Sequence, residues 1–196
     1  GKLFKPRDAK LFKPRNSLGN TGGQFYTAKN PEYGAVFTYN LNNVPKTSKS
    51  LRMQREKRLN ADNMDIPFPG YDKLTDEMNE KPASIILTIK DTEGNHIRNI
   101  KKNASNGSSR IAWNLRHQSY YPIRAGRGQA NSWFNPSGPY VTPGEYHAEI
   151  YLENNGSVEK LDGPIAFNVK PLRKGTLEGA SYSDYNSFRT RVSNLY

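Results

Sequence analysis

Carboxylates and histidines are the side chains of this sequence whose types and spacing suggest chemistry. Hydrolysis of a glycosidic bond needs two carboxylates flanking it, and Asp72 with Glu77 or Glu149 with Glu153 are candidate pairs. Nothing in the surrounding sequence distinguishes these four from ordinary solvated carboxylates. The histidines lack metal-ligand spacing and are interpreted as surface side chains on or beside expected strands: His96, His117 and His147.

Sequence motifs of nucleophilic, phosphate-binding and metal-dependent catalysis are absent. There is no G-x-S-x-G elbow, P-loop, H-E-x-x-H or dinucleotide fingerprint. The glycine-rich stretch 125–128 lacks both the spacing of a phosphate-binding loop and a strand leading into it. The chain has no cysteine, which excludes disulfides, thiolate metal sites and thiol nucleophiles. We therefore predict a protein that is not an enzyme and holds no metal or cofactor.

The aromatic segment 116–141 is the strongest candidate for a ligand site. It has no hydrophobic period, and a loop of this length is usually functional or disordered. Its Trp and Tyr rings suit stacking on sugars or peptide side chains, and its Arg residues suit hydrogen bonding. In the alternative, its Trp and Phe side chains fold back to cover an open end of the domain. The candidate ligand-binding residues are Tyr120, Tyr121, Arg124, Arg127, Trp133 and Phe134.

The net charge of +11 is distributed unevenly. A hexapeptide, KLFKPR, occurs at 2–7 and again at 10–15, and a second cationic cluster lies at 46–58. Clustered cations are typical of polyanion binding, and solvated surfaces are the alternative interpretation. No helix-turn-helix, RNP-type or zinc-finger pattern accompanies the charge, so nucleic acid is the less favoured partner. The candidate polyanion-binding residues of the arm are Lys2, Lys5, Arg7, Lys10, Lys13 and Arg15.

The N-terminal arm is expected to be extended. Each proline of the repeat disfavours helix at the residue before it, so the arm should lie along a neighbouring surface. We expect Leu3, Phe4, Leu11 and Phe12 to dock there as paired apolar side chains.

Alternation of apolar and polar residues predicts that strands dominate the rest of the chain. Strands are expected at 35–41, 84–90 with its hairpin partner 96–100 across a turn at 91–95, 110–115, 146–152 and 165–169. Helices are expected at 46–58, capped by Thr47 or Ser48, at 72–80, and from 181 onward, capped by Ser181 or Ser183. This pattern favours a mainly β fold: an antiparallel β-sandwich of immunoglobulin-like or fibronectin-III-like type with short helical insertions and a C-terminal helix.

The domain organisation follows from the same pattern. Residues 1–29 are interpreted as a basic extended arm, and 30–172 as the sandwich domain with a helical insertion at about 43–82. Residues 173–196 are interpreted as a linker and the start of a helical segment.

Four segments together resemble a known bacterial family. They are NPEYGAVF at 30–37, ILTI at 86–89 with the following EG, RIAWNLR at 110–116 and VTPGEY at 141–146. About residues 28–172 are similar to the C-terminal region of sortilin-like, BNR-repeat glycosyl hydrolase-like proteins of Bacteroidota. The last two segments are also similar to the immunoglobulin-like domain of flagellar hook-assembly scaffolds.

The resemblance implies an accessory role. In the family a β-propeller precedes this region and a helical segment follows it, and the propeller's S-x-D-x-G-x-x-W box is absent here. We expect a non-catalytic scaffolding module of an exported bacterial protein, in the cell envelope or outside the cell. Its expected partners are other domains of the parent protein, an envelope protein or a glycan. No segment approaches membrane-spanning length.

Overall fold

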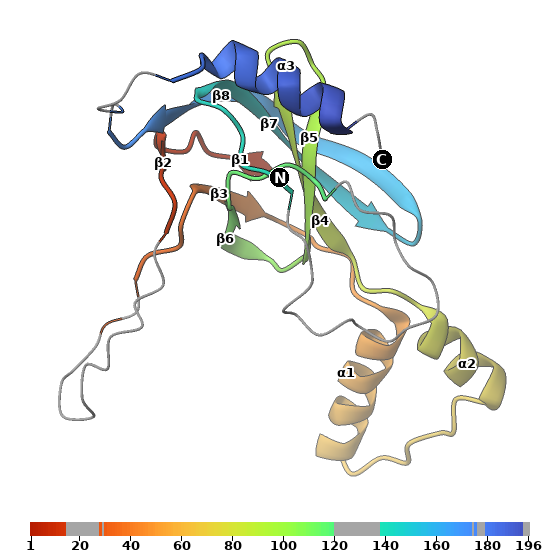
Figure 1. The fold of residues 1–196 in the computed structure, drawn as a ribbon. Helices are drawn as coiled ribbons and strands as arrows, with labels where there is room; N and C mark the ends of the chain where they lie inside the picture. Colours follow the sequence, from red (N-terminus) through yellow and green to blue (C-terminus); the bar gives the residue numbers. More distant parts are fainter. Residues whose placement is uncertain (15–27, 29, 120–137, 174, 176–178, 194–196) are drawn as a thin grey trace, which may run out of the picture.

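The computed structural model describes residues 1–14, 28, 30–119, 138–173, 175 and 179–193. The fold is mainly β, as predicted (Figure 1). The strands are β1 (Lys2–Leu3), β2 (Ala9–Leu11), β3 (Ala35–Leu41), β4 (Ser84–Asp91), β5 (His96–Asn103), β6 (Gly107–Trp113), β7 (Gly144–Asn154) and β8 (Ser157–Pro171). The helices are α1 (Ser48–Ala61), α2 (Tyr71–Asn79) and α3 (Tyr182–Ser193).

The strands form two sheets. One is three-stranded with the order β1-β3-β6, and the other is five-stranded with the order β2-β8-β7-β4-β5. The five-stranded sheet is visibly curved (Figure 1). The expected hairpin is confirmed, since β4 and β5 pair antiparallel with Leu87 opposite Ile100. The expected antiparallel pairing is found in the described strand pairs with one exception, since β2 runs parallel to β8.

One hydrophobic core lies between the two sheets. On β3 every second residue is buried, which is the burial pattern that its sequence alternation predicts. Trp113 is fully buried, and its ring contacts that of Phe167 in the other sheet edge to face, with ring centroids 6.0 Å apart. The ring of Phe37 makes a second edge-to-face contact with that of Phe167, with ring centroids 5.1 Å apart. Aromatic rings from both sheets therefore pack together among the buried aliphatic side chains of the core.

The N-terminal arm contributes a strand to each sheet. The first hexapeptide copy forms β1 and pairs antiparallel with β3, with Leu3 opposite Tyr39. The second copy begins within β2, where Leu11 lies beside Pro171 of β8. The described part of the arm, residues 1–14, contains no helix, and its two short strands, β1 and β2, belong to the two sheets. Only part of the expected docking occurs, because Leu3 is 2% exposed whereas Phe4 and Phe12 are 43% and 42% exposed.

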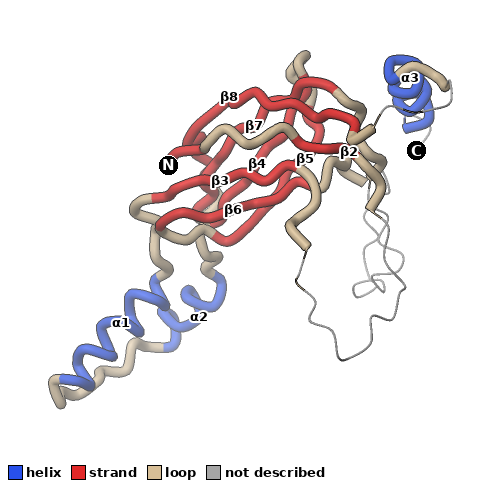
Figure 2. Tube along the Cα trace, turned by 90° about the vertical axis from the view of Figure 1, so that its left-hand side faces the viewer, coloured by secondary structure: helices blue, strands red, loops and turns tan. Residues whose placement is uncertain are grey.

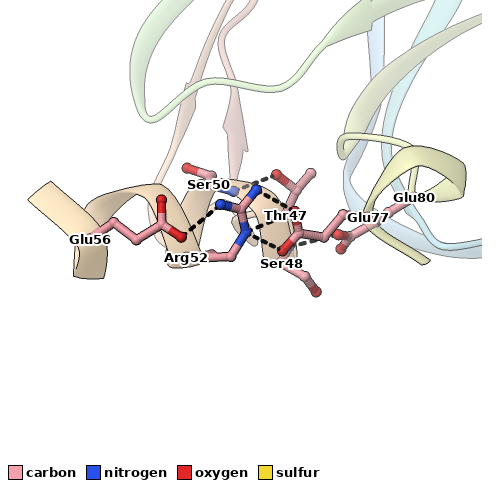
Figure 3. A network of polar contacts seen from close by, with 7 residues as sticks. All are labelled: Thr47, Ser48, Ser50, Arg52, Glu56, Glu77 and Glu80. Atoms are coloured by element: carbon pink, nitrogen blue, oxygen red, sulfur yellow. Dashed lines mark hydrogen bonds and ion pairs between the residues drawn. The ribbon is translucent and has the colours of Figure 1, made fainter. Parts of the chain in front are cut away.

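The expected helical insertion projects away from the sheets as a pair of helices, α1 and α2 (Figure 2). Neither helix has a buried residue. An ion pair joins the two helices (Figure 3): Arg52 Nη2 of α1 lies 2.8 Å from Glu77 Oε2 of α2. Within α1, Arg52 Nη1 also lies 2.7 Å from Glu56 Oε1. The predicted cap is confirmed, because Thr47 Oγ1 accepts the backbone N–H of Ser50 at 3.2 Å.

The strand β6 ends two residues earlier than predicted. Leu115 has a positive φ of 56°, so the backbone leaves the extended conformation although the side chain stays buried. The residue that precedes β3, Gly34, lies very close to the backbone at the end of β6. At Gly34, with a φ of 106°, a Cβ atom would lie 1.9 Å from the carbonyl oxygen of Trp113. Only glycine fits this approach.

The helix α3 contacts the segment that precedes β7 through polar side chains. Asn186 Nδ2 donates to Thr142 Oγ1 at 2.9 Å, and Arg189 Nη1 donates to the carbonyl of Tyr140 at 2.8 Å. The predicted cap is confirmed, since Ser181 Oγ accepts the backbone N–H of Asp184 at 3.1 Å. The expected C-terminal helix is therefore present and capped as predicted.

Candidate binding groove

A groove of about 930 Å³ crosses the outer face of the three-stranded sheet. The residues that line it come from four separate stretches of sequence and carry both charged and apolar side chains. They are Phe4, Lys5, Pro6, Arg7, Asp8, Pro31, Glu32, Gly34, Val36, Thr38, Lys102 and Arg110.

The pleat of the sheet explains why these side chains meet. Because alternate residues of β3 point into the core, Val36 and Thr38 lie on the opposite face. On one side of β3, the backbone N–H of Phe4 donates a hydrogen bond to the backbone carbonyl of Thr38 at 2.9 Å. On the other side of β3, Arg110 of β6 lies opposite Thr38 in the strand register. The floor of the groove is thus formed by β3, with the first hexapeptide copy at one edge and β6 at the other.

The groove has an excess of positive charge. It is lined by four cations, Lys5, Arg7, Lys102 and Arg110, and two carboxylates, Asp8 and Glu32. Asp8 already pairs with a lysine outside the lining, Lys170, at 2.5 Å, and that hydrogen bond lowers the pKa of Asp8.

The four groove cations are available to a ligand. None of the ion pairs between described residues includes any of them. Lys102 Nζ donates to the backbone carbonyl of Arg110 at 2.7 Å, which fixes its position without neutralising its charge. The groove therefore presents uncompensated cations on both of its sides.

A row of aromatic rings begins next to the groove. Phe12 contacts Tyr33 edge to face with ring centroids 4.9 Å apart, and Tyr33 lies 6.4 Å from Tyr140. The guanidinium of Arg116 stacks over Tyr140 at 3.7 Å. Arg116 and Tyr140 also form a β-bridge, so the row includes both ends of the aromatic segment 116–141.

The predicted site residues divide into those that line the groove, those that are exposed elsewhere and those that the structure does not describe. Tyr120, Tyr121, Arg124, Arg127, Trp133 and Phe134, together with Arg15 of the arm, lie outside the described residues. The other predicted arm cations are exposed: Lys2, Lys5, Arg7, Lys10 and Lys13. Only Lys5 and Arg7 of these line the groove.

Sequence reasoning missed the two groove cations on β5 and β6, Lys102 and Arg110. The signal for Arg110 was present, since alternation with Ile111 places it on the outward face of the predicted strand. No local signal in the sequence brings the arm to the same face. No residue of α1 lines the groove, so the second cationic cluster does not join the arm there.

Glu149, one of the candidate catalytic carboxylates, lies between two lysines. It is 6% exposed, and its carboxylate oxygens are 2.6 Å from Lys90 Nζ and 2.6 Å from Lys160 Nζ. Tyr151 donates a further hydrogen bond at 2.8 Å. Burial by itself raises the pKa of Glu149, but the hydrogen bonds from Lys160, Lys90 and Tyr151 outweigh it and lower the pKa to about 2. The interpretation of Glu149 as a solvated carboxylate is wrong, and it is not a proton donor at neutral pH.

Two further candidate carboxylates are also ion-paired. Glu153 pairs with Lys101, and Glu77 pairs with Arg52. A second hollow, of about 300 Å³, lies beside Glu153 and includes Lys101 in its lining. The carboxylates that sequence reasoning considered for acid–base work are thus mostly engaged with cations.

The histidines are separated in the structure. His96 is exposed and His147 is half-buried, in agreement with a surface position. His117 differs, because burial and the nearby Arg189 lower its pKa to about 4. Among the described residues, no group of three or more His, Cys, Asp or Glu side chains is arranged to bind a metal ion. None of the helices in the described part of the chain is both long and apolar enough to span a membrane.

Comparisons with protein-family models, with curated proteins and with solved structures found no match to this chain. The resemblance to the Bacteroidota proteins therefore depends on the four sequence segments quoted for it.

Proposed function

We propose that this chain is a non-catalytic β-sandwich module of immunoglobulin-like type, which binds or scaffolds for other molecules. The order of its strands supports the architecture. In the immunoglobulin arrangement, strands A, B and E share one sheet and strands C, C′, F and G the other. The sheet β1-β3-β6 corresponds to the first set, and β4, β5, β7 and β8 correspond to the second. The short strand β2 is a continuation of the first strand that has crossed to the second sheet.

A tyrosine corner is the observation on which the architectural proposal depends most. Tyr146 stands near the start of β7, the equivalent of strand F, and its hydroxyl donates to the carbonyl of Thr142 at 2.7 Å. This contact to a carbonyl a few residues upstream is a feature of immunoglobulin-like sandwiches. One departure concerns the core tryptophan, since Trp113 lies on β6 whereas antibody domains have theirs on strand C.

The ion pairs that Glu149, Glu153 and Glu77 form with lysine or arginine support the non-catalytic role. General acid catalysis near neutral pH needs a carboxyl group whose pKa is raised, and the lysines around Glu149 lower it instead. Four sequence segments support placing the module in an exported bacterial protein, in the envelope or outside the cell. Its partners there would be other domains of the parent protein, an envelope protein or a glycan.

An assay of turnover tests the proposal. The chain of 196 residues is incubated with chromogenic glycosides and with a peptide library, and no product above the uncatalysed background is expected. Glu149→Gln serves as the matched variant, because it removes the carboxylate with little change of shape. Turnover by the native chain that disappears in Glu149→Gln would show that the module is an enzyme.

A further inference from the structure

We propose that the groove on the outer face of the three-stranded sheet binds an acidic polysaccharide, a sugar chain that bears carboxylate or sulfate groups. The inference rests on the proposed role as a binding module and adds the surface and the chemical class of the ligand.

The charge of the groove selects an anionic ligand. In the described part of the lining there are four cations, one of the two carboxylates is paired with Lys170, and Glu32 is the other carboxylate. Two of the cations are arginines, Arg7 and Arg110, whose planar guanidinium groups match carboxylate and sulfate oxygens in bidentate geometry. Both are exposed, so their donors face solvent.

The position of the cations selects an extended ligand. Lys5 and Arg7 follow β1 at one edge of the sheet, whereas Arg110 belongs to β6 at the other edge. Between them lie the small outward side chains of Val36 and Thr38, which leave an open floor. A single anion would reach one edge only, but a polymer with repeated charges contacts both edges at once.

The apolar part of the groove favours sugar over nucleic acid. Among the residues that the structure describes, Phe4 is the one aromatic side chain in the lining, and it is 43% exposed. Lys2 Nζ lies 5.5 Å from the centre of its ring, on the same edge of the sheet. Single-stranded nucleic acid is usually held by several aromatic side chains on which successive bases stack. One exposed ring suits the apolar face of one sugar, with Thr38 available for hydroxyl groups.

The test compares binding of defined polymers to the full chain at low salt. The probes are heparin, which is sulfated, polygalacturonate, which is carboxylated, neutral dextran, and a single-stranded DNA oligonucleotide of matched charge. At least one acidic polysaccharide should bind more tightly than the DNA, and dextran should not bind. Affinity should fall as salt rises, since the contacts are between exposed charges.

Charge-reversal variants locate the site. Replacing both arginines, Arg7→Glu with Arg110→Glu, should weaken polysaccharide binding by about tenfold or more, the loss expected for about one charge-assisted hydrogen bond. The matched control, Lys57→Glu with Arg58→Glu on α1, changes the net charge equally at exposed positions outside the groove. It should weaken binding much less. The neutral pair, Arg7→Gln with Arg110→Gln, repeats the test if the first variant loses its circular dichroism spectrum.

Three results would overturn the proposal. They are no binding of either acidic polysaccharide at low salt, tighter binding of the DNA oligonucleotide, or equal loss of affinity in the groove variant and the α1 control. Each of these would leave the non-catalytic role intact, because that role is tested by turnover.

Discussion

The two copies of the hexapeptide have identical sequences and different surroundings. In the first copy, Leu3 is 2% exposed and pairs antiparallel with β3, whereas in the second copy Leu11 is half-buried and pairs parallel with β8. Phe4 and Phe12 are exposed to nearly the same extent, at 43% and 42%. Phe4 lines the basic groove, however, while Phe12 packs against Tyr33.

This difference shows which properties of the arm are local. The prolines keep both copies extended, because they exclude helix at the preceding lysines. The choice of neighbour is not local, since it depends on which sheet edge is open where the chain passes. Identical residues therefore contribute to the core and the groove in one copy, and to an aromatic row in the other.

The largest expected difference between the copies is in stability. Leu3→Ala should lower the free energy of unfolding by about 2–4 kcal/mol, because it leaves a cavity at the edge of the core. Leu11→Ala should cost about 1 kcal/mol, since its side chain is only partly removed from water. Urea denaturation of the two variants measures both values. Equal losses would mean that the two copies are equally well packed.

An intermediate loss of stability is expected when the carboxylate of Asp162, which binds the first copy, is replaced. Asp162 Oδ2 accepts the backbone N–H of Leu3 at 2.7 Å, and hydrogen bonds from Leu3 and Gly163 lower its pKa from 3.8. Asp162→Asn should lower the free energy of unfolding by about 1 kcal/mol at neutral pH.

The sign of the pH dependence at Asp162 follows from this lowered pKa. The stabilisation is fully present above pH 3.8, the ordinary value, and is lost as the pH falls through the lowered pKa. The difference between native and Asp162→Asn chains should therefore shrink in acid. Asp8→Asn, at the exposed pair with Lys170, serves as the control and should leave the urea midpoint unchanged. A constant difference at all pH values would contradict the assignment.

The smallest expected effect concerns the two phenylalanines. Phe12→Ala should destabilise the fold by only about 0.5 kcal/mol, because it removes an edge-to-face contact of a partly exposed ring with Tyr33. Phe4→Ala should leave stability nearly unchanged and reduce polysaccharide affinity instead. Thermal unfolding and heparin binding of the two variants separate these outcomes. A loss of affinity in Phe12→Ala as large as in Phe4→Ala would extend the binding surface to the aromatic row.

Much of the fold was predictable because its signals are local. The period of two along β3, the turn between β4 and β5 and the hydroxyl of Thr47 each act within a few residues, and all three predictions are confirmed. The end of β6 was not predictable from alternation, because Leu115 stays buried while its backbone turns.

The candidate site was less predictable because it is not local. The cations of the arm were identified from their density in the sequence, but their partners in the groove come from β5 and β6, about a hundred residues away. The two copies of the arm also have the same local pattern, so no sequence rule distinguishes the one that reaches the groove. The carboxylate of Glu149 was misjudged for a similar reason, since its two lysines come from neighbouring strands.

The close approach of Gly34 to Trp113 has a consequence for the evolution of this protein. Gly34 lines the groove, yet any side chain there would collide with a backbone oxygen and separate β3 from β6. A mutational scan of ligand binding would therefore score this position as intolerant, as it would a residue that contacts the ligand. Measuring protein abundance in the same scan separates the two cases, because substitutions at Gly34 should remove the folded protein, whereas substitutions at Arg7 should weaken ligand binding and leave the amount of folded protein unchanged.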